Sequence, residues 1–122
     1  MKTGIIIQAR SMSTRFPQKI LKPLPYNSSL TVLDQVIRRV KLTKSVDEII
    51  IATTLNSEDN EIAKTAKRNK VQVFRGSEND VLDRYYNAAI SRELDIIVRL
   101  TSDCPCIDWN IIDNIVKEFK II

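Results

Sequence analysis

Short runs of β-branched and other apolar residues alternate along the chain with stretches of helical spacing, and this alternation limits the folds open to it. The first run, residues 4–9, is apolar on both faces, which is typical of a strand buried in a parallel sheet. The other predicted strands cover residues 48–54, 71–74 and 95–100. Because a helical pattern follows each strand, the sequence predicts a three-layer α/β/α fold with right-handed crossovers and a mostly parallel, Rossmann-like sheet.

Amphipathic spacing predicts four helices, over residues 31–43, 58–69, 78–92 and 109–119. Side chains that can accept hydrogen bonds from first-turn amides mark their starts: Thr31 with Asp34, Ser57, Ser77 with Asp80, and Asp108. Asn69 is expected to end the second helix in the left-handed conformation. The residues expected on the apolar helix faces are Leu33, Val36, Ile37, Val40, Ile62, Ala63, Ala66, Val81, Leu82, Tyr85, Ala89, Ile111, Ile112, Ile115, Val116 and Phe119.

The composition excludes several kinds of site from what we expect to be a single domain over residues 1–122. Without histidine the chain has no Ser-His-Asp or Cys-His nucleophile system, and its two glycines are too few for Gly-rich phosphate loops. Cys104 and Cys106 lack zinc-site spacing, and we expect reduced thiols. No apolar run is long enough to cross a bilayer and no export signal is visible, so we expect a cytoplasmic protein without a membrane partner.

Positive charge is concentrated in the first third of the chain. Residues 1–44 carry nine Lys or Arg against the single acid Asp34, a net charge of +8, whereas residues 45–122 carry ten against fourteen. This asymmetry favours an anionic ligand at the N-terminal end of the fold. Aromatic residues make up only 6% of the chain and do not interleave with basic runs, so we expect no nucleic-acid partner.

Two segments qualify for a ligand site, because open parallel sheets bind ligands beyond the carboxyl ends of strands where the strand order reverses. One segment is residues 8–24, after the first strand. Its part over residues 8–19 carries three permanent cations, Arg10, Arg15 and Lys19, with the hydroxyls of Ser13 and Thr14 between them. That composition suits a triphosphate, and a solvated basic loop is the alternative interpretation. Residues 101–107, after the fourth strand, carry Asp103.

Four ordered blocks resemble one known family. Residues 8–19, QARSMSTRFPQK, are similar to the signature that opens the cytidylyltransferases making CMP-activated sugar acids. The other blocks are VFRGSENDVLDRY at residues 73–85, VRLTSDCP at residues 98–105, and Ile107 with Asp108. Together they look most like the spore coat polysaccharide biosynthesis protein F branch, which is related to CMP-Kdo synthetase. The resemblance spans residues 4 to about 119, roughly the first half of a typical member.

The resemblance implies a fold of the nucleotide-diphospho-sugar transferase type and a CTP-dependent cytidylyltransferase that activates a sugar acid for polysaccharide biosynthesis. In the family reaction a sugar hydroxyl attacks the α-phosphate of CTP and pyrophosphate leaves, with Mg²⁺ as cofactor. The family's triphosphate-binding loop matches Arg10, Ser13, Arg15 and Lys19, and Arg15 and Lys19 are assigned to catalysis with Asp103, the match to the Mg²⁺ carboxylate.

Three further residues match family positions that line the nucleotide or sugar side of the cleft: Arg75, Asp83 and Arg84. Surface charge is the alternative interpretation for Asp83 and Arg84, because both lie within a predicted helix. The chain departs from the family signature at three positions, where Met12, Gln18 and Ser102 replace small residues or glycine that let backbone amides approach phosphate.

Two other functions stay open at this point. A nucleotide-sugar-dependent glycosyltransferase shares the architecture but commonly carries D-x-D, and only Asp103 stands at that place here. A non-catalytic remnant or interaction module of the same fold is the second alternative. The apolar ending at Ile121 and Ile122 leads us to expect the N-terminal part of a longer domain, one that associates through an uncovered face as a homo-oligomer.

Overall fold

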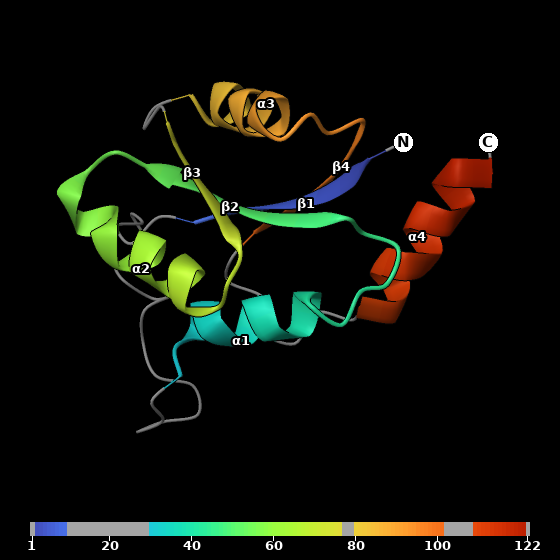
Figure 1. The fold of residues 1–122 in the computed structure, drawn as a ribbon, viewed down its shortest axis with the longest axis horizontal. Coiled ribbons are helices and arrows are strands. Elements are labelled where there is room, and N and C mark those ends of the chain that lie inside the picture. Colours follow the sequence, from blue (N-terminus) through green and yellow to red (C-terminus); the bar gives the residue numbers. More distant parts are fainter. Residues whose placement is uncertain (1, 10–29, 77–79, 102–108, 122) are drawn as a thin grey trace.

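The computed structural model describes residues 2–9, 30–76, 80–101 and 109–121, and it has the predicted alternation of strands and helices (Figure 1). In chain order the elements are β1 (Thr3–Gln8), α1 (Val32–Val40), β2 (Glu48–Thr54), the 3-10 turn η2 (Ser57–Asp59), α2 (Asn60–Arg68), β3 (Gln72–Gly76), α3 (Val81–Ser91), β4 (Ile96–Thr101) and α4 (Trp109–Ile121). Among the described residues, no helix combines the length and apolar character needed to cross a membrane.

The four strands form one parallel sheet in the order β3-β2-β1-β4. Ile6 at the centre pairs with Ile50 of β2 on one side and Arg99 of β4 on the other. The chain moves outward from β1 through β2 to β3 and then returns across the sheet to place β4 on the other side of β1. The strand order therefore reverses between β1 and β4, as a doubly wound sheet requires.

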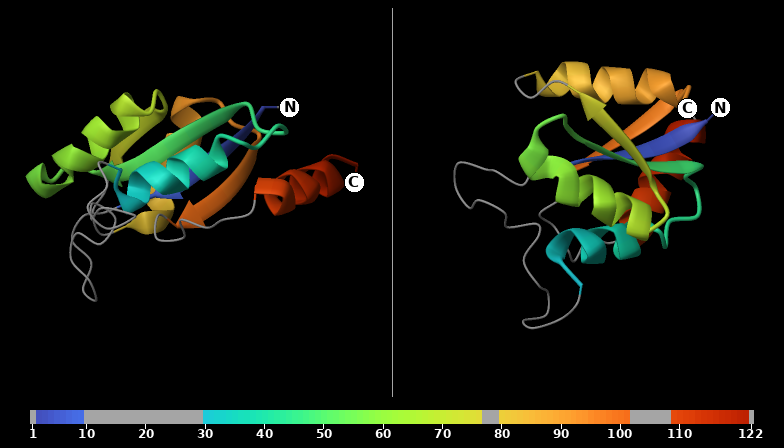
Figure 2. Two further views of the ribbon diagram at one scale, coloured as in Figure 1. Left: turned by 90° about the horizontal axis from the view of Figure 1, so that it is seen from below. Right: turned by 60° about the vertical axis from the view of Figure 1, so that its left-hand side comes forward.

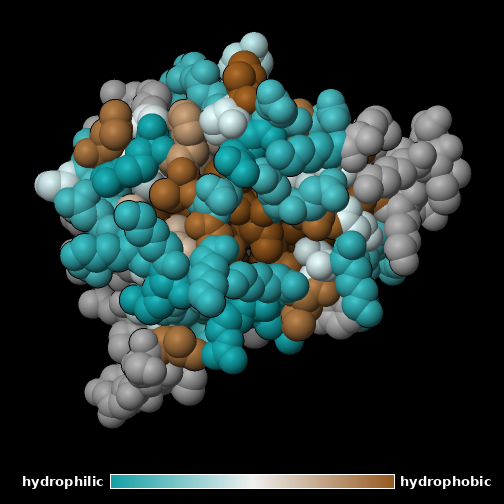
Figure 3. Space-filling model, in the orientation of Figure 1, coloured by the Kyte–Doolittle hydropathy of each residue, from teal (hydrophilic) through white to brown (hydrophobic). Residues whose placement is uncertain are grey.

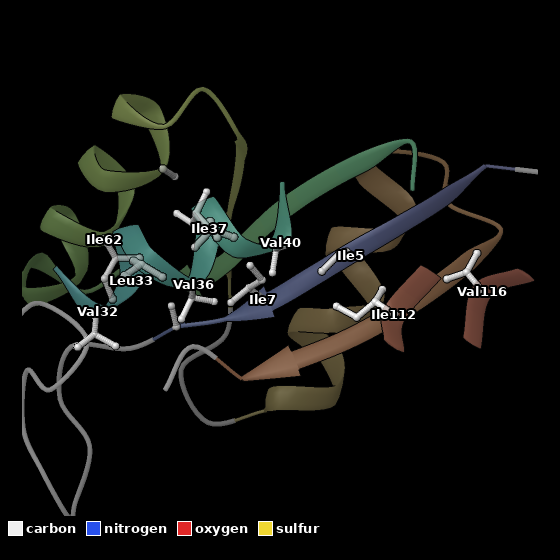
Figure 4. Close-up of a cluster of buried hydrophobic side chains, with 13 residues drawn as sticks. Ile5, Ile7, Val32, Leu33, Val36, Ile37, Val40, Ile62, Ile112 and Val116 are labelled. Carbon is white, nitrogen blue, oxygen red and sulfur yellow. The ribbon is translucent and has the colours of Figure 1, made fainter. Parts of the chain in front are cut away.

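Alternate residues of the buried strands supply two cores, one on each side of the sheet (Figure 2). Ile5 and Ile7 point into the larger core, where they meet α1, α2 and α4 (Figure 4). Ile6 points the other way and packs with Tyr85 and Ala89 of α3. The β-branched run of β1 is thus completely buried, because helices cover both of its faces.

The predicted start of α1 is confirmed, and that of α3 is corrected by three residues. Thr31 and Asp34 form a capping box in which each side chain bonds the other residue's backbone amide. The Asp80 carboxylate caps α3 by accepting from the Asp83 amide at 2.9 Å. Ser77 and Asp108, the other predicted caps, lie outside the described residues.

The predicted end of the second helix is wrong by one residue. Asn69 is not left-handed (φ −92°), and Lys70 takes the positive φ of 59° instead. The Asn69 amide group donates to Asp34 Oδ1 at 2.7 Å and to the carbonyl of Thr65 at 2.8 Å. Those two bonds hold Asn69 against the helices, so the reversal of the chain falls on the next residue. The start also differs, since Ser57 opens the 3-10 turn and α2 follows it.

Three residues predicted to face the core are exposed: Leu82, Ile111 and Ile115. On α3 the sheet-facing side is made by Tyr85, Ala88 and Ala89, and on α4 it is made by Ile112 and Val116. The apolar arc of each helix is therefore wider than the arc that this four-stranded sheet covers. Phe119 of the same predicted face belongs to the part whose side chains the structure does not describe.

Candidate functional site

All four strands end along one edge of the sheet, which we call the carboxyl edge. Gln8 of β1 pairs with Ala52 of β2 and with Thr101 of β4, and Thr54 of β2 pairs with Gly76 of β3. The segments that follow β1 and β4 leave from neighbouring strand ends, at the point where the strand order reverses. This is where an open parallel sheet binds its ligand.

Five of the predicted site residues lie outside the described residues: Arg10, Ser13, Arg15, Lys19 and Asp103. The structure shows the positions of Ala9 and Thr101, from which the two segments that contain these residues begin. Residue 10 follows Ala9, whose amide still bonds the Ala52 carbonyl at 3.0 Å, and residue 103 comes two positions after the end of β4.

Arg75, next to the end of β3, uses its guanidinium to hold the connection between β2 and α2. Its Nε donates to the Thr54 carbonyl at 2.7 Å, its Nη2 to the Asn56 carbonyl at 2.9 Å, and its Nη1 to Asn60 Oδ1 at 2.9 Å. Three acceptors on one connection match the fixed fork of donors that only arginine offers. The described contacts of Arg75 are therefore structural ones at the carboxyl edge.

The connection that Arg75 holds contains polar residues that sequence reasoning did not select. The Thr54 hydroxyl donates to the buried carboxylate of Asp59 and also accepts from the Asn56 amide at 3.2 Å. Thr53 is fully buried, and its hydroxyl has no hydrogen-bond partner in the described structure. The sequence signal for these residues was the mainly polar run 53–60, which directly follows the apolar part of β2. The backbone groups of such a run need hydrogen-bond partners, and its own polar side chains can supply them.

The first turn of α3 also lies at this edge and carries the two remaining predicted residues. Asp83 is exposed, in agreement with the surface-charge interpretation, although it stands at a helix N-terminus. Arg84 is 1% exposed and is thus no surface charge. A cation buried beside the carboxyl edge adds positive charge where an anionic ligand is expected.

One further contact ties α3 to β4 near the same edge. The guanidinium of Arg99 lies over the ring of Tyr85, 4.5 Å from its centroid, and the Tyr85 hydroxyl donates to the Leu100 carbonyl at 3.3 Å. Tyr85 is buried, as predicted. These two contacts hold α3 close to the carboxyl end of β4.

The carboxylates with shifted pKa values lie away from this edge. Burial by itself would raise the pKa of Asp34, but hydrogen bonds from the Thr31 amide, Asn69 and Arg68 outweigh it and lower that pKa. A hydrogen bond from Arg92, with a smaller contribution from Lys2, lowers the pKa of Glu48. Both groups thus stay charged in structural ion pairs. No cluster of three His, Cys, Asp or Glu residues suited to a metal occurs among the described residues.

Comparison with known proteins decides the family, because residues 4–120 match the cytidylyltransferases. This chain belongs to the cytidylyltransferase family. The spore coat polysaccharide biosynthesis protein SpsF of Bacillus subtilis is 36% identical over 92% of this chain and 47% of its own length. The resemblance found in the sequence is thereby confirmed. The chain spans about half the length of the curated relatives it matches.

Solved structures confirm the fold of the cytidylyltransferase chain. A cytidylyltransferase from Leptospira borgpetersenii superposes with a TM-score of 0.93 at 45% identity, over 99% of this chain and 50% of that one. A CMP:2-keto-3-deoxy-manno-octonic acid synthetase in complex with CTP gives a TM-score of 0.82 at 20% identity, over 98% of this chain and 48% of that one, and it supports the fold alone.

Proposed function

We propose that this chain supplies the nucleotide-binding part of an enzyme that transfers CMP from CTP to a sugar acid. The observation that carries the proposal is the pairing of β1 with β4 across the point where the strand order reverses. The segment with the basic cluster and the segment with Asp103 start from these neighbouring strand ends. A triphosphate at this edge would therefore have cations on one side and a carboxylate on the other.

In this proposal the basic cluster binds the triphosphate. Arg10 and Arg15 contact phosphate oxygens in pairs, Lys19 acts as a point charge, and the Ser13 hydroxyl donates a further hydrogen bond. Arg84 adds its buried positive charge from α3. Arg75 acts indirectly, since its guanidinium holds the β2–α2 connection that forms the neighbouring part of the edge.

Mg²⁺ fits the residues at this place. The ion prefers oxygen ligands and is commonly held by one or two carboxylates together with substrate phosphates, so Asp103 and the triphosphate make a suitable donor set. When bound, the ion would neutralise charge on the phosphates. Of the described carboxylates at this edge, Asp59 accepts from the Thr54 hydroxyl and Asp80 accepts from the Asp83 amide, so both already make structural hydrogen bonds.

The chemistry that we propose needs no covalent intermediate. A hydroxyl oxygen of the sugar acid forms a bond to the α-phosphorus, the bond from that phosphorus to the pyrophosphate oxygen breaks, and the hydroxyl proton passes to solvent. The protein contributes positioning and charge neutralisation, both of which a chain without histidine can supply. The sugar-acid acceptor is supported by the name of a relative, a 3-deoxy-manno-octulosonate cytidylyltransferase that is 30% identical over 98% of this chain, and by the polysaccharide role named for the Bacillus relative.

Calorimetric titration with CTP and with CMP, in the presence of Mg²⁺, tests the proposal. We expect tighter binding of CTP, and we expect Lys19→Ala to weaken CTP binding by about 1.5–3 kcal/mol because it removes a charge-assisted contact. Lys67→Ala, on the exposed side of α2, is the matched control and should leave the affinity unchanged. Failure of the chain to bind CTP would contradict the proposal, and equal affinities of the two variants would remove Lys19 from the site.

A further inference from the structure

The positive charge that the sequence concentrates in residues 1–44 falls into two separate parts. Arg10, Arg15 and Lys19 belong to the segment that leaves the carboxyl edge, and the proposed function uses them. Another four cations gather at the end of α1 and in the connection to β2: Arg38, Arg39, Lys41 and Lys44. That connection reaches the amino end of β1, where the Asp47 amide donates to the Thr3 carbonyl at 2.8 Å. These four cations therefore lie toward the edge of the sheet opposite the proposed site.

Helix α2 packs beside α1 on the same side of the sheet and adds further cations (Figure 3). Residues 34–44 and 60–70 together hold eight Lys or Arg against two acids, Asp34 and Glu61. Each acid pairs with a cation of α2, Asp34 with Arg68 at 2.7 Å and Glu61 with Lys64 at 3.2 Å. We call the six cations outside these two pairs the basic face, and all six are exposed: Arg38, Arg39, Lys41, Lys44, Lys67 and Lys70.

Hydrogen bonds between the two helices bring the charges of the basic face together. The Lys41 ammonium donates to the Asn69 carbonyl, and the Asn69 amide group donates to Asp34 at 2.7 Å. Cations favour the carbonyl ends of helices, which accounts for charge within the last turns. Lys44 and Lys70 lie beyond the ends of α1 and α2. The basic face therefore carries more positive charge than the helix ends account for.

One part of the basic face is a hollow in which cations surround an exposed apolar side chain. Four residues share one side of α1 and the turn that continues it, because they recur at intervals of three or four: Gln35, Arg38, Arg39 and Leu42. Together with Lys41 they line a hollow of about 450 Å³, and Leu42 is 47% exposed. Three cations around an apolar side chain suit a ligand that has a negative headgroup and an apolar tail.

We propose that the basic face docks on an anionic lipid bilayer, with its cations on the headgroups and Leu42 in the headgroup region. Cations and an apolar side chain supply the two contributions that hold peripheral proteins on such a surface. A nucleic acid is favoured less, because residues 34–44 and 60–70 contain no aromatic side chain for base stacking. The sequence predicted no membrane partner because no segment can cross a bilayer, and a face that lies on the surface needs no such segment.

Flotation of the 122-residue chain with lipid vesicles tests the proposal. We expect binding to vesicles of equal parts phosphatidylglycerol and phosphatidylcholine, little binding to phosphatidylcholine alone, and weaker binding as the salt concentration rises. The double variant Arg38→Gln with Lys67→Gln should weaken binding about thirtyfold, because it removes two cations from the docking surface. The matched control, Leu82→Glu with Asn110→Asp, lowers the net charge equally at exposed positions of α3 and α4 and should leave binding nearly unchanged.

Leu42→Ser distinguishes a bilayer from other polyanions. It should weaken vesicle binding about fivefold, because it removes the apolar side chain that enters the headgroup region. Leu55→Ser, in the β2–α2 connection, is its control and should have no effect, since Leu55 is exposed outside the basic face.

Two kinds of result would overturn the proposal. The first is equal binding to neutral and anionic vesicles, or an equal loss in a variant and its control. The second is tighter binding to duplex DNA or to polyglutamate than to anionic vesicles, which would indicate a nucleic acid or an acidic protein instead. None of these readouts depends on CTP binding, so the proposed function can fail or hold independently.

Discussion

The carboxylate of Asp34 makes hydrogen bonds at the start of α1 and at the end of α2. It closes the capping box of α1, its Oδ2 accepts from Arg68 Nη2 at 2.7 Å, and its Oδ1 accepts from Asn69 Nδ2 at 2.7 Å. The carboxylate is buried, whereas the Arg68 side chain is about half exposed. The residue therefore joins α1 to α2 through bonds that require its negative charge.

We expect Asp34→Asn to lower the free energy of unfolding at pH 7 by about 2–4 kcal/mol, since it removes charged hydrogen bonds and leaves buried donors unpaired. Because the pKa of Asp34 is lowered from its ordinary value of 3.8, the contribution is complete above that value and is lost as the pH falls through the lowered pKa. Urea denaturation at pH 7 and in the acid range measures both effects.

The control for this prediction is Glu61→Gln, which removes a carboxylate from the exposed pair with Lys64. Its effect should stay below about 0.5 kcal/mol at either pH, as is usual for exposed helix pairs. A difference between wild type and Asp34→Asn that is the same at pH 7 and in acid would show that the charge of Asp34 does not stabilise the fold.

At the scale of elements, the shape of the carboxyl edge depends on side-chain hydrogen bonds from one strand to the connection that follows a neighbouring strand. The guanidinium of Arg75 on β3 reaches three acceptors of the β2–α2 connection, and the Thr54–Asp59 hydrogen bond closes that connection on itself. Tyr85 makes a comparable tie between α3 and β4. These ties give a strand end a fixed shape without a metal or disulfide.

We expect Arg75→Lys to lower the free energy of unfolding by about 1–3 kcal/mol, because a single ammonium cannot satisfy three acceptors in that geometry. Hydrogen exchange of residues 55–60 should become faster, and urea denaturation gives the free energy. Arg38→Lys on the exposed side of α1 serves as the control. If Arg75→Lys instead weakened CTP binding while stability and exchange stayed the same, Arg75 would contact the nucleotide directly.

At the scale of the whole molecule, binding and turnover place different demands on the chain. Triphosphate binding in the proposed site draws on residues within 1–122, and the chain spans about half the length of the curated relatives it matches. Mg²⁺ held by one protein carboxylate keeps several waters and relies on substrate phosphates. Binding should therefore be present in the 122-residue chain without efficient catalysis.

We predict no measurable pyrophosphate release from CTP and a sugar acid by the 122-residue chain. A single polypeptide that joins residues 1–122 to the unmatched half of the Leptospira cytidylyltransferase should release pyrophosphate. Asp103→Asn in that polypeptide should abolish the release, because it removes the proposed metal carboxylate. Glu61→Gln is the control that should keep full activity. Robust release by the short chain would show that residues 1–122 already contain a complete catalytic site.

The local sequence determined the order and type of every described strand and α-helix, because each of them has a hydrophobic periodicity that can be read from neighbouring residues. The 3-10 turn η2 was not predicted. The capping box of Thr31 and Asp34 and the family blocks were visible for the same reason. The proposed phosphate and metal residues come from those blocks and stay predictions, since Arg10, Ser13, Arg15, Lys19 and Asp103 lie outside the described residues.

Tertiary structure alone decided which part of each apolar pattern is buried and what the long polar side chains touch. Leu82, Ile111 and Ile115 have the spacing of core residues and yet are exposed. Their exposure could not be predicted, because the sequence of a helix does not show how wide the sheet beneath it is. The partners of Arg75 lie 15 to 21 positions earlier in the chain and meet it only because β2 and β3 pair in one register. Contacts between distant segments depend on strand order and register, which no local pattern contains.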